Sequence, residues 1–267
     1  MAEGAELLRS AFDAGVRAES LYVAPEGAAV PGVDELVERA LVLGARVYDL
    51  APGVLPKVAD TVTPQPVLGV LSMVDVGLES LLSPTLVVVC VDVRDPGNAG
   101  TVLRSADAAG ASAVVFAGTT VDPYNPKTVR ASAGSLFHLP VVVADDVAAA
   151  LEALGRLGLR RLATAVRDGV DYSAVDWSVP SALVLGNEAA GLPDDVAARV
   201  DGTVSIPMAG RAESLNVGVA AAVLCFEALR QRRRGSVITE RGAAGSTMPE
   251  MIRPRTEGTA TPPVSTP

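Results

Sequence analysis

The chain consists of two successive stretches in which helical and strand-like patterns alternate. In the first, apolar residues recur at helical spacing over residues 5–15 and 32–45. The shorter apolar runs at 20–25, 46–50 and 66–74 are expected to be strands, and Pro25 closes the first of them. This pattern predicts a small α/β unit over residues 1–76, followed by a linker at 77–85.

The second stretch begins at Leu86 and has longer, near-continuous apolar runs, which are typical of parallel strands buried on both faces beneath covering helices. The six expected strands are residues 86–93, 113–118, 139–144, 161–166, 182–187 and 203–208. A long helical pattern over 214–234 then ends in the basic stretch RQRRR. The sequence therefore predicts an α/β domain with a parallel sheet over residues 86–234. The Gly-, Ser-, Thr- and Pro-rich residues 235–267 predict a disordered tail.

Composition excludes several classes of protein. No apolar segment approaches the roughly 18 residues of a membrane span, and the start MAEGAELLRSAFDAGVR lacks the basic-then-apolar order of a signal peptide. Cys90 and Cys225 lie in apolar runs, which predicts buried structural thiols. The single histidine, His138, has no candidate metal ligands near it in the sequence. We therefore expect a cytoplasmic protein without a metal site.

The net charge of −9 argues against a general attraction to nucleic acid. Residues 1–80 hold 5 Lys/Arg and 12 Asp/Glu, net −7; residues 81–230 hold 11 and 16, net −5; residues 231–267 hold 6 and 3, net +3. Any RNA-binding surface must therefore be a local patch on an acidic body.

The first stretch with candidate chemistry is DPGNAGTVLR, residues 95–104, between an apolar strand and a helical pattern. It lacks the glycine spacing of a dinucleotide-binding turn and the lysine of a phosphate-binding loop. Gly97 and Gly100 are explained by a tight strand-to-helix turn. That explanation leaves out Arg104, whose guanidinium could reach back to a phosphate held at the helix start.

Two further stretches place polar side chains after strands. In LVLGNEAAGLPDDV, residues 183–196, Glu188 is either a carboxylate at the start of a helix or one held at the carboxyl end of the sheet, where ligands of α/β folds bind. In SIPMAGRAESLNVGVAAAV, residues 205–223, Ser214 is expected to cap the last helix. Asn216 would then lie in its first turn.

The order and spacing of NAGTVLR, LGNEAAGL and IPMAGRAESLNV resemble the three signature motifs of the SpoU/TrmH branch of the SPOUT RNA methyltransferases. NPKTVRASAGSLFHLPV, residues 125–141, resembles the segment between the first two motifs. The first unit resembles the ribosomal-protein-like RNA-binding domain that often precedes this domain, with TPQPVLGVL as its final strand. The arrangement is similar to ribosomal RNA ribose methyltransferases of the thiostrepton-resistance type.

The resemblance implies an α/β fold with a trefoil knot, formed from about Leu183 to the last helix, and a homodimer. It also implies that the knotted loops bind S-adenosylmethionine, largely through backbone groups. The positions matching the cofactor site are Thr164, Ala165, Leu185, Gly186, Ile206, Met208 and Leu215.

The implied reaction is methyl transfer to a ribose 2′-hydroxyl of RNA, without a metal ion. The family assigns activation of the hydroxyl to the arginine that matches Arg104. Because arginine stays protonated in proteins, we expect Arg104 to clamp the target phosphate and to stabilise a developing alkoxide. The resemblance further implies that Asn98 fixes Arg104 or the ribose, that Glu188 orients Arg104, and that Ser214 and Asn216 hold the ribose.

Ribosomal RNA, of the large subunit, is the favoured substrate, with residues 1–76 selecting the target. One alternative is a transfer-RNA ribose methyltransferase, although those relatives often lack the first unit. Another is a non-catalytic RNA-binding or assembly factor, against which the intact motif residues argue. The sequence does not identify the modified nucleotide or decide between a housekeeping and an antibiotic-resistance role. It also leaves open whether the natural start lies upstream of Met1.

Overall fold

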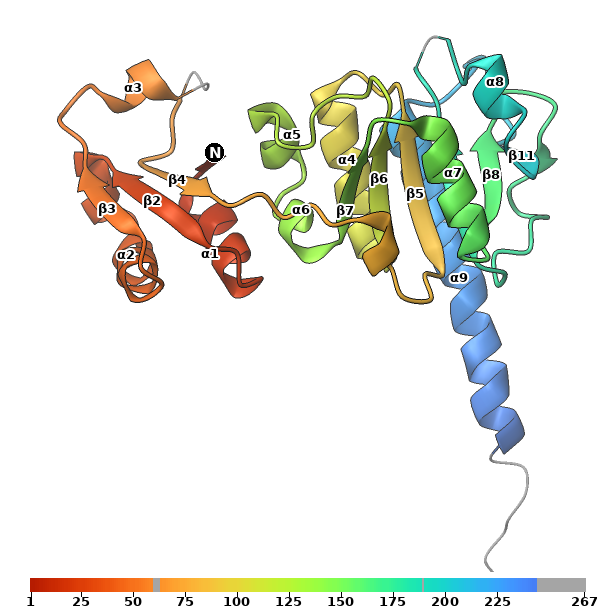
Figure 1. Ribbon diagram of the computed structural model, residues 1–267, viewed down its shortest axis with the longest axis horizontal. Coiled ribbons are helices and arrows are strands. Elements are labelled where there is room, and N and C mark those ends of the chain that lie inside the picture. Colours follow the sequence, from red (N-terminus) through yellow and green to blue (C-terminus); the bar gives the residue numbers. More distant parts are fainter. Residues whose placement is uncertain (60–62, 189, 244–267) are drawn as a thin grey trace, which may run out of the picture.

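The computed structural model describes residues 1–59, 63–188 and 190–243, and it arranges them around two sheets (Figure 1). The first sheet has four strands and the second has seven. The segment between the last strand of the first sheet and the first strand of the second, residues 72–85, contains one short 3-10 helix, η2 (Leu78–Ser80).

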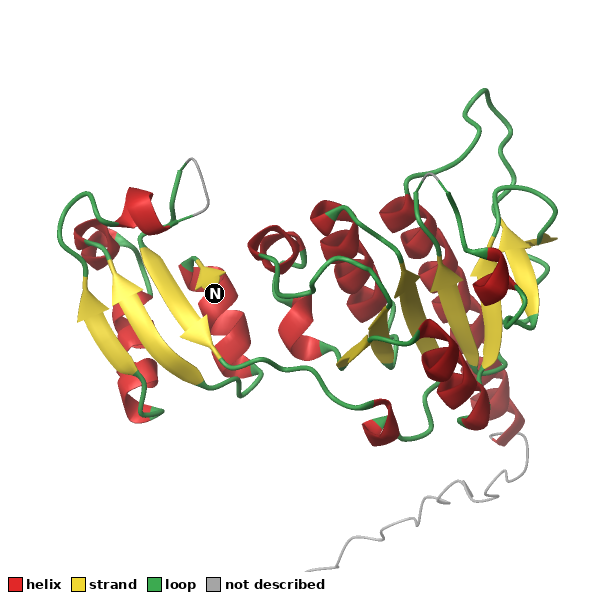
Figure 2. Ribbon diagram, turned by 45° about the horizontal axis from the view of Figure 1, so that its top comes forward, coloured by secondary structure: helices red, strands yellow, loops and turns green. Residues whose placement is uncertain are grey.

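The four-stranded sheet has the order β1-β4-β2-β3, with β3 at its outer edge. The elements of this N-terminal unit are β1 (Ala2–Glu3), α1 (Ala5–Asp13), β2 (Ala18–Val23), η1 (Pro25–Ala29), α2 (Val33–Val42), β3 (Arg46–Asp49), α3 (Leu55–Val58) and β4 (Val67–Leu71). Strands β2 and β3 are parallel, whereas β4 runs antiparallel to β1 and β2. Helices α1 and α2 cover one face of the sheet, where Leu8, Phe12, Leu21 and Leu36 form its core (Figure 2).

The seven-stranded sheet is parallel throughout, in the order β7-β6-β5-β10-β8-β11-β9. Its strands are β5 (Leu86–Val91), β6 (Ala113–Ala117), β7 (Val141–Ala144), β8 (Arg160–Thr164), β9 (Val170–Asp171), β10 (Ser181–Leu185) and β11 (Gly202–Ser205). The helices are α4 (Pro96–Ala108), α5 (Pro126–Ala131), α6 (Ser135–His138), α7 (Val147–Arg156), α8 (Asp194–Ala197) and α9 (Val217–Ala243). The predicted parallel sheet is confirmed.

Helices cover both faces of this sheet, which explains the near-continuous apolar strands. Val88 and Cys90 of β5 pack in the core beneath α4 and α9, whereas Val87 and Val89 pack in the core beneath α7. Every residue of β5 is buried. Figure 1 shows α7 on the near face and α4 and α9 behind the sheet.

The last helix, α9, is longer than predicted, because it continues to Ala243. The prediction that a disordered tail begins at residue 235 is therefore wrong for residues 235–243, and residues 244–267 lie outside the described part of the chain. The stretch GSVITERGA contains no proline, so every residue in it can donate a backbone hydrogen bond to the helix. None of the described helices is both long and apolar enough to cross a bilayer.

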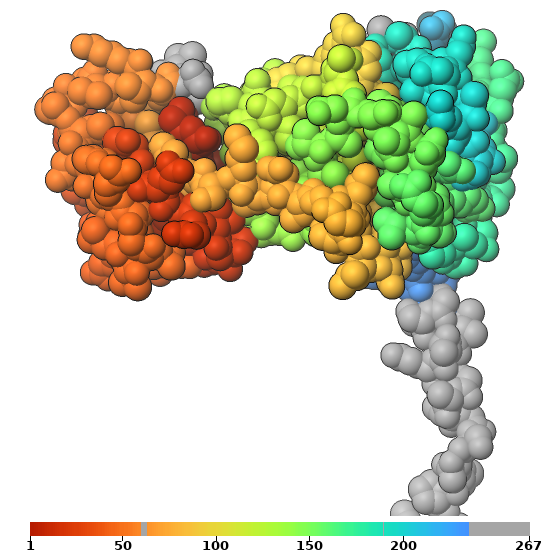
Figure 3. Space-filling view, viewed as in Figure 1, coloured from red at the N-terminus to blue at the C-terminus, as the bar shows by residue number. Residues whose placement is uncertain are grey.

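The two units are in contact through α5, α6 and the segment that joins them (Figure 3). Ser10 Oγ on α1 lies 2.9 Å from Nε2 of His138, the single histidine, at the end of α6. The Tyr124 hydroxyl accepts hydrogen bonds from the backbone N–H groups of Val74 and Asp75, both at 2.8 Å, and donates one to the Asp75 carboxylate at 2.7 Å. The start of the connecting segment is thereby fixed against the second unit.

Both cysteines are buried and free, as predicted. Burial raises the pKa of the Cys225 thiol to about 12, and it raises the pKa of the Cys90 thiol still further. Since the thiolate is the reactive form, both cysteines are inert core residues.

Candidate active site

The first of the three motifs begins α4, and its glycines lie inside the helix. Pro96 is the first helical residue, and the Asp95 carboxylate caps the helix by accepting a hydrogen bond from the backbone N–H of Asn98 at 2.9 Å. This hydrogen bond, followed by the charge of Lys127, keeps the pKa of Asp95 below its usual value. The cap orients the first turn of α4 so that Asn98 lies at the carboxyl end of β5.

The second motif forms a closed turn after β10. The backbone N–H of Asn187 donates to the carbonyl of Gly191 at 2.9 Å, and the N–H of Gly191 donates to the carbonyl of Asn187 at 3.0 Å. A Cβ on Gly186 would lie 2.6 Å from the backbone carbon of Gly191, so only glycine permits this approach. Glu188 is exposed on this turn, well before α8 begins at Asp194. It is therefore a carboxylate at the carboxyl end of the sheet and not a helix-start residue.

The third motif caps α9, but with a different residue from the one predicted. The helix begins at Val217, and Asn216 Oδ1 accepts hydrogen bonds from the N–H groups of Gly218 at 2.9 Å and Val219 at 3.3 Å. The prediction that Ser214 caps the helix is wrong because the chain becomes helical only after Asn216, itself a favourable N-cap residue. Ser214 instead lies in the exposed segment before the helix.

Side chains from the three motifs form one hydrogen-bonded chain. Asn216 Nδ2 donates to Asn98 Oδ1 at 2.8 Å, and Asn98 Nδ2 donates to Glu188 Oε1 at 2.7 Å. Because Asn216 Oδ1 is already bound to the start of α9, the orientation of both amides is fixed along the chain. The carboxylate of Glu188 is thus bound by Asn98 in the first turn of α4, and Asn98 is bound in turn by Asn216, which caps α9.

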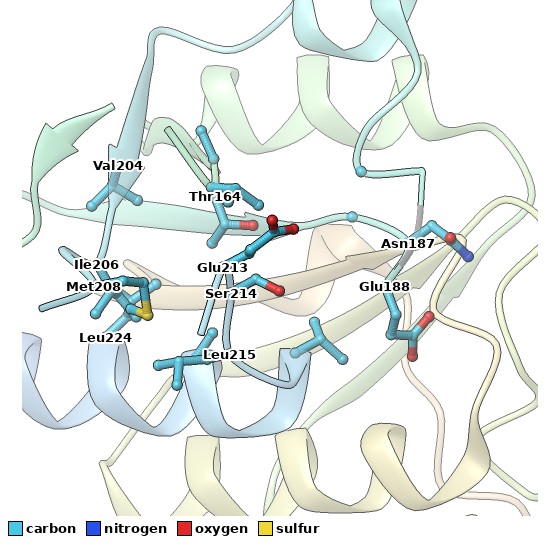
Figure 4. Close-up of a pocket in the computed structure, with 16 residues that line it drawn as sticks. Thr164, Asn187, Glu188, Val204, Ile206, Met208, Glu213, Ser214, Leu215 and Leu224 are labelled. Carbon is cyan, nitrogen blue, oxygen red and sulfur yellow. The ribbon is translucent and has the colours of Figure 1, made fainter. Parts of the chain in front are cut away.

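A cavity of about 120 Å³ opens beside this chain, at the carboxyl ends of β8, β10 and β11. Its lining residues are Thr164, Ala165, Val166, Gly186, Asn187, Glu188, Gly191, Val204, Ile206, Met208, Glu213, Ser214, Leu215, Val217, Ala220 and Leu224. Figure 4 shows the apolar side chains at one end, Asn187 and Glu188 at the other, and Glu213 and Ser214 between them.

Six of the seven residues predicted to bind a cofactor line this cavity: Thr164, Ala165, Gly186, Ile206, Met208 and Leu215. Leu185 does not line it, because the alternation of side chains along β10 places Leu185 in the core beneath α4 and α9. Four further residues line the cavity but were not predicted from the sequence. They are Glu213, which directly precedes Ser214, and Val217, Ala220 and Leu224 on one face of α9. The spacing of three and four residues along α9 is the signal that could have identified that face.

Arg104 does not lie where the sequence analysis expected it. It is exposed on α4 and makes no hydrogen bond or ion pair with any residue that the structure describes. Neither Asn98 nor Glu188 contacts Arg104 in the structure. Six residues of an α-helix place positions 98 and 104 on different faces, so the other expected role of Asn98, holding the ribose, stays a prediction.

Arg104 instead shares a face of α4 with Thr101, three positions earlier. Thr101 contacts the start of α9, since a Cβ on Gly218 would lie 2.9 Å from the Thr101 Cβ. Arg104 is therefore directed along the side of α4 that adjoins α9.

Two other cations lie near the motifs, and both have carboxylate partners. Arg94 Nε is 2.8 Å from Asp92 Oδ1, and Lys127 Nζ is 3.5 Å from Asp95 Oδ2. Among the described residues, no group of three His, Cys, Asp or Glu side chains is placed to hold a metal ion. Within the described ranges, Arg104 and Arg211, an exposed residue of the third motif, flank the motifs without a carboxylate partner.

Residues 85–226 match the SpoU rRNA Methylase family. The chain is 38% identical over 183 residues to the 23S rRNA (guanosine(2553)-2′-O)-methyltransferase RlmP of Bacillus subtilis (strain 168), covering 68% of this chain and 72% of that protein. It is 43% identical over 152 residues to the 23S rRNA (uridine(2479)-2′-O)-methyltransferase of Streptomyces viridochromogenes, covering 54% and 52%.

Solved structures match over most of the chain. The AdoMet-bound rRNA methyltransferase from Sinorhizobium meliloti superposes with a TM-score of 0.77 and 34% identity, over 86% of each chain. The SpoU methyltransferase AviRb from Streptomyces viridochromogenes, in complex with the cofactor AdoMet, gives 0.76 and 33% identity, over 88% of this chain and 90% of that chain. The matched part is larger than residues 86–234, so it extends into the N-terminal unit.

Proposed function

Because the chain belongs to the SpoU rRNA methylase family, we propose that it transfers a methyl group from S-adenosylmethionine to the 2′-hydroxyl of a ribose in 23S ribosomal RNA. The predicted fold class, the knotted α/β fold of SPOUT methyltransferases, is confirmed by the solved relatives and by the parallel sheet. The observation that carries the proposal is the chain Asn216–Asn98–Glu188, which joins all three motifs at the rim of one cavity.

The cavity suits S-adenosylmethionine, which combines an apolar aromatic base with two positive charges. Ile206, Met208 and Leu224 offer an apolar surface at one end for the adenine. The carboxylates of Glu213 and Glu188 line the middle and the other end, where they favour the sulfonium and the ammonium group. When bound, the cofactor supplies an electrophilic methyl group.

In this proposal the protein's own residues bind and orient the RNA. A ribose hydroxyl is a weak nucleophile until its proton is shared or removed. Arg104, which remains protonated, binds the phosphate beside the target ribose and stabilises negative charge that develops on the 2′-oxygen. Ser214 and the amides of Asn98 and Asn216 position the ribose, and Glu188 holds Asn98 in the orientation that this requires.

Ribosomal RNA is favoured over transfer RNA because two similar relatives are named as 23S rRNA methyltransferases and because the solved rRNA enzyme matches beyond the methyltransferase domain. The role of residues 1–76 in selecting the RNA is part of this proposal, as is a cytoplasmic location, where the substrate is found. A non-catalytic assembly factor would have no need for the ordered amide–carboxylate chain.

We predict that S-adenosylmethionine binds without metal and without RNA. Isothermal titration calorimetry in the presence of EDTA is expected to show saturable binding, because the cavity walls come from the protein alone. A titration that shows no heat up to millimolar cofactor would contradict the assignment of this cavity.

We further propose that the protein is a homodimer and that α9 contributes the interface. Val219 and Phe226 lie seven positions apart, hence on one face of α9, and are 47% and 48% exposed. Leu215, just before the helix, is 36% exposed. Arg104 is directed along the same side of the molecule, so a second subunit on this face would enclose Arg104 between the two copies.

Light scattering is expected to give about twice the 27.2 kDa mass of the chain. The substitution Phe226→Arg should shift the mass to that of one chain, because it places a charge in an apolar interface. Val42→Arg is the matched control, since Val42 is 87% exposed on α2 of the other unit and should leave the dimer intact. A single-chain mass for the unmodified protein at micromolar concentration would refute the dimer.

A further inference from the structure

The N-terminal sheet presents one face that neither α1 nor α2 covers. In the register of β2 and β3, Ser20 pairs with Arg46 and Tyr22 pairs with Tyr48, so these four side chains lie on the same face. Leu21, which alternates with them, is buried against α1 and α2 on the opposite face. Figure 2 shows the two long helices of this unit on one side of the sheet only.

Two tyrosines on this open face form a stack that ends at the edge of the sheet. The rings of Tyr22 and Tyr48 lie 5.3 Å apart between centroids, with an interplanar angle of 18°. Tyr22 is partly buried, since it packs against Ala24, Leu55 and Leu68. Tyr48 belongs to β3, the edge strand, and is 42% exposed. The outer face of the Tyr48 ring is thus open to a further flat ring.

The charges of the unit are divided between its two faces. On the helical face, Arg39 is paired with Asp13 at 2.8 Å, and Arg9 is paired with Glu6. Further carboxylates in the first part of α2 are Asp34, Glu35 and Glu38. The helical face, on the side away from the tyrosines, thus carries part of the net charge of −7 over residues 1–80.

The open face carries a cation that is available to bind an anion. Arg46 lies two positions before Tyr48 on the same face of β3. It makes no ion pair with any residue in the described ranges. An exposed aromatic ring with a cation beside it is the combination by which proteins bind single-stranded nucleic acid.

We propose that Tyr48, supported by Tyr22, is a stacking platform for an unpaired base of the substrate RNA, and that Arg46 binds a phosphate next to that base. This inference rests on the proposed function, because it takes ribosomal RNA to be the substrate. It places the RNA on the open sheet face, on the side away from the carboxylates of α2. Single-stranded loops are where ribosomal RNA offers such bases.

The test compares variants for binding to unmodified 23S rRNA transcribed in vitro, measured by filter binding, and for methyl transfer to the same RNA. Tyr48→Ala is expected to weaken RNA binding about tenfold, in keeping with a single stacked base. Tyr48→Phe, which keeps the ring, should bind nearly as well as the unmodified protein. Arg46→Ala should weaken binding and also reduce its dependence on salt.

The matched control is Leu41→Ala, since Leu41 is 56% exposed on α2 of the same unit but on the helical side. Thermal unfolding followed by circular dichroism reports whether the N-terminal unit of each variant remains folded, and calorimetric S-adenosylmethionine binding reports that the second unit is intact. Unchanged RNA binding by Tyr48→Ala, in a preparation whose unmodified protein methylates 23S rRNA, would overturn the platform and leave the proposed function standing. Absence of methylation by the unmodified protein would instead count against the proposed function.

Photo-crosslinking gives a second, independent result. RNA that contains 4-thiouridine is expected to crosslink to the peptide that carries Tyr48. Crosslinks to the N-terminal unit that are confined to α1 and α2 would overturn the assignment of the sheet face.

Discussion

The substitution Arg104→Ala is expected to lower the rate of methyl transfer to 23S rRNA by a factor of about 100 to 1,000, the typical effect of removing one group that stabilises developing negative charge. Affinity for S-adenosylmethionine should stay nearly unchanged, because Arg104 does not line the cavity. Stability should also be unaffected, since the side chain is exposed and makes no hydrogen bond with a described residue. Single-turnover methylation and calorimetric cofactor binding measure the two effects separately.

Arg104→Lys distinguishes a planar clamp from a simple charge. Lysine keeps the positive charge but loses the fork that binds phosphate oxygens at two points. We expect Arg104→Lys to recover little activity. Substantial recovery would reduce Arg104 to a point charge, and a near-normal rate for Arg104→Ala would remove it from the mechanism altogether.

The second large effect is expected from Gly186→Ala. The added methyl group would lie 2.6 Å from the backbone carbon of Gly191 and 2.8 Å from the backbone nitrogen of Leu192. Because backbone atoms cannot rotate away, the turn that carries Glu188 must shift. Overpacking of this kind costs about 1–3 kcal/mol, equivalent to a loss in cofactor affinity of roughly 5- to 150-fold if all of it falls on the bound state.

The matched control is Gly210→Ala, in the segment between β11 and α9. A Cβ on Gly210 meets no atom within 4 Å, so cofactor binding should be retained. Calorimetry and thermal unfolding of both variants provide the comparison. Equal cofactor affinity in Gly186→Ala and the unmodified protein would show that the turn is not part of the binding site.

The order of the main strands could be predicted from the sequence because their apolar runs are long and near-continuous. The parallel sheet follows from strands such as β5, in which every residue is buried. The end of α9 could not be predicted from composition, since the helix continues to Ala243 although the sequence becomes polar and glycine-containing after Arg234.

The candidate site could be predicted as a set of residues but not as a geometry. The motifs identified Asn98, Glu188 and Asn216, yet their mutual hydrogen bonds join positions up to 118 residues apart, which no local pattern reveals. The cap on α9 was assigned to Ser214 because serine and asparagine are both good N-cap residues. The separation of Arg104 from Asn98 follows from the 3.6-residue turn of α4, which the loop sequence alone does not show.

The central claim is most directly tested by identifying the methylated atom. Unmodified 23S rRNA should be incubated with the protein and S-adenosylmethionine labelled in its methyl group, then digested to nucleosides and separated by chromatography. The account predicts that the label appears in a 2′-O-methylated nucleoside and that Arg104→Ala abolishes most of it. Label in a methylated base, or incorporation into transfer RNA with none into 23S rRNA, would contradict it.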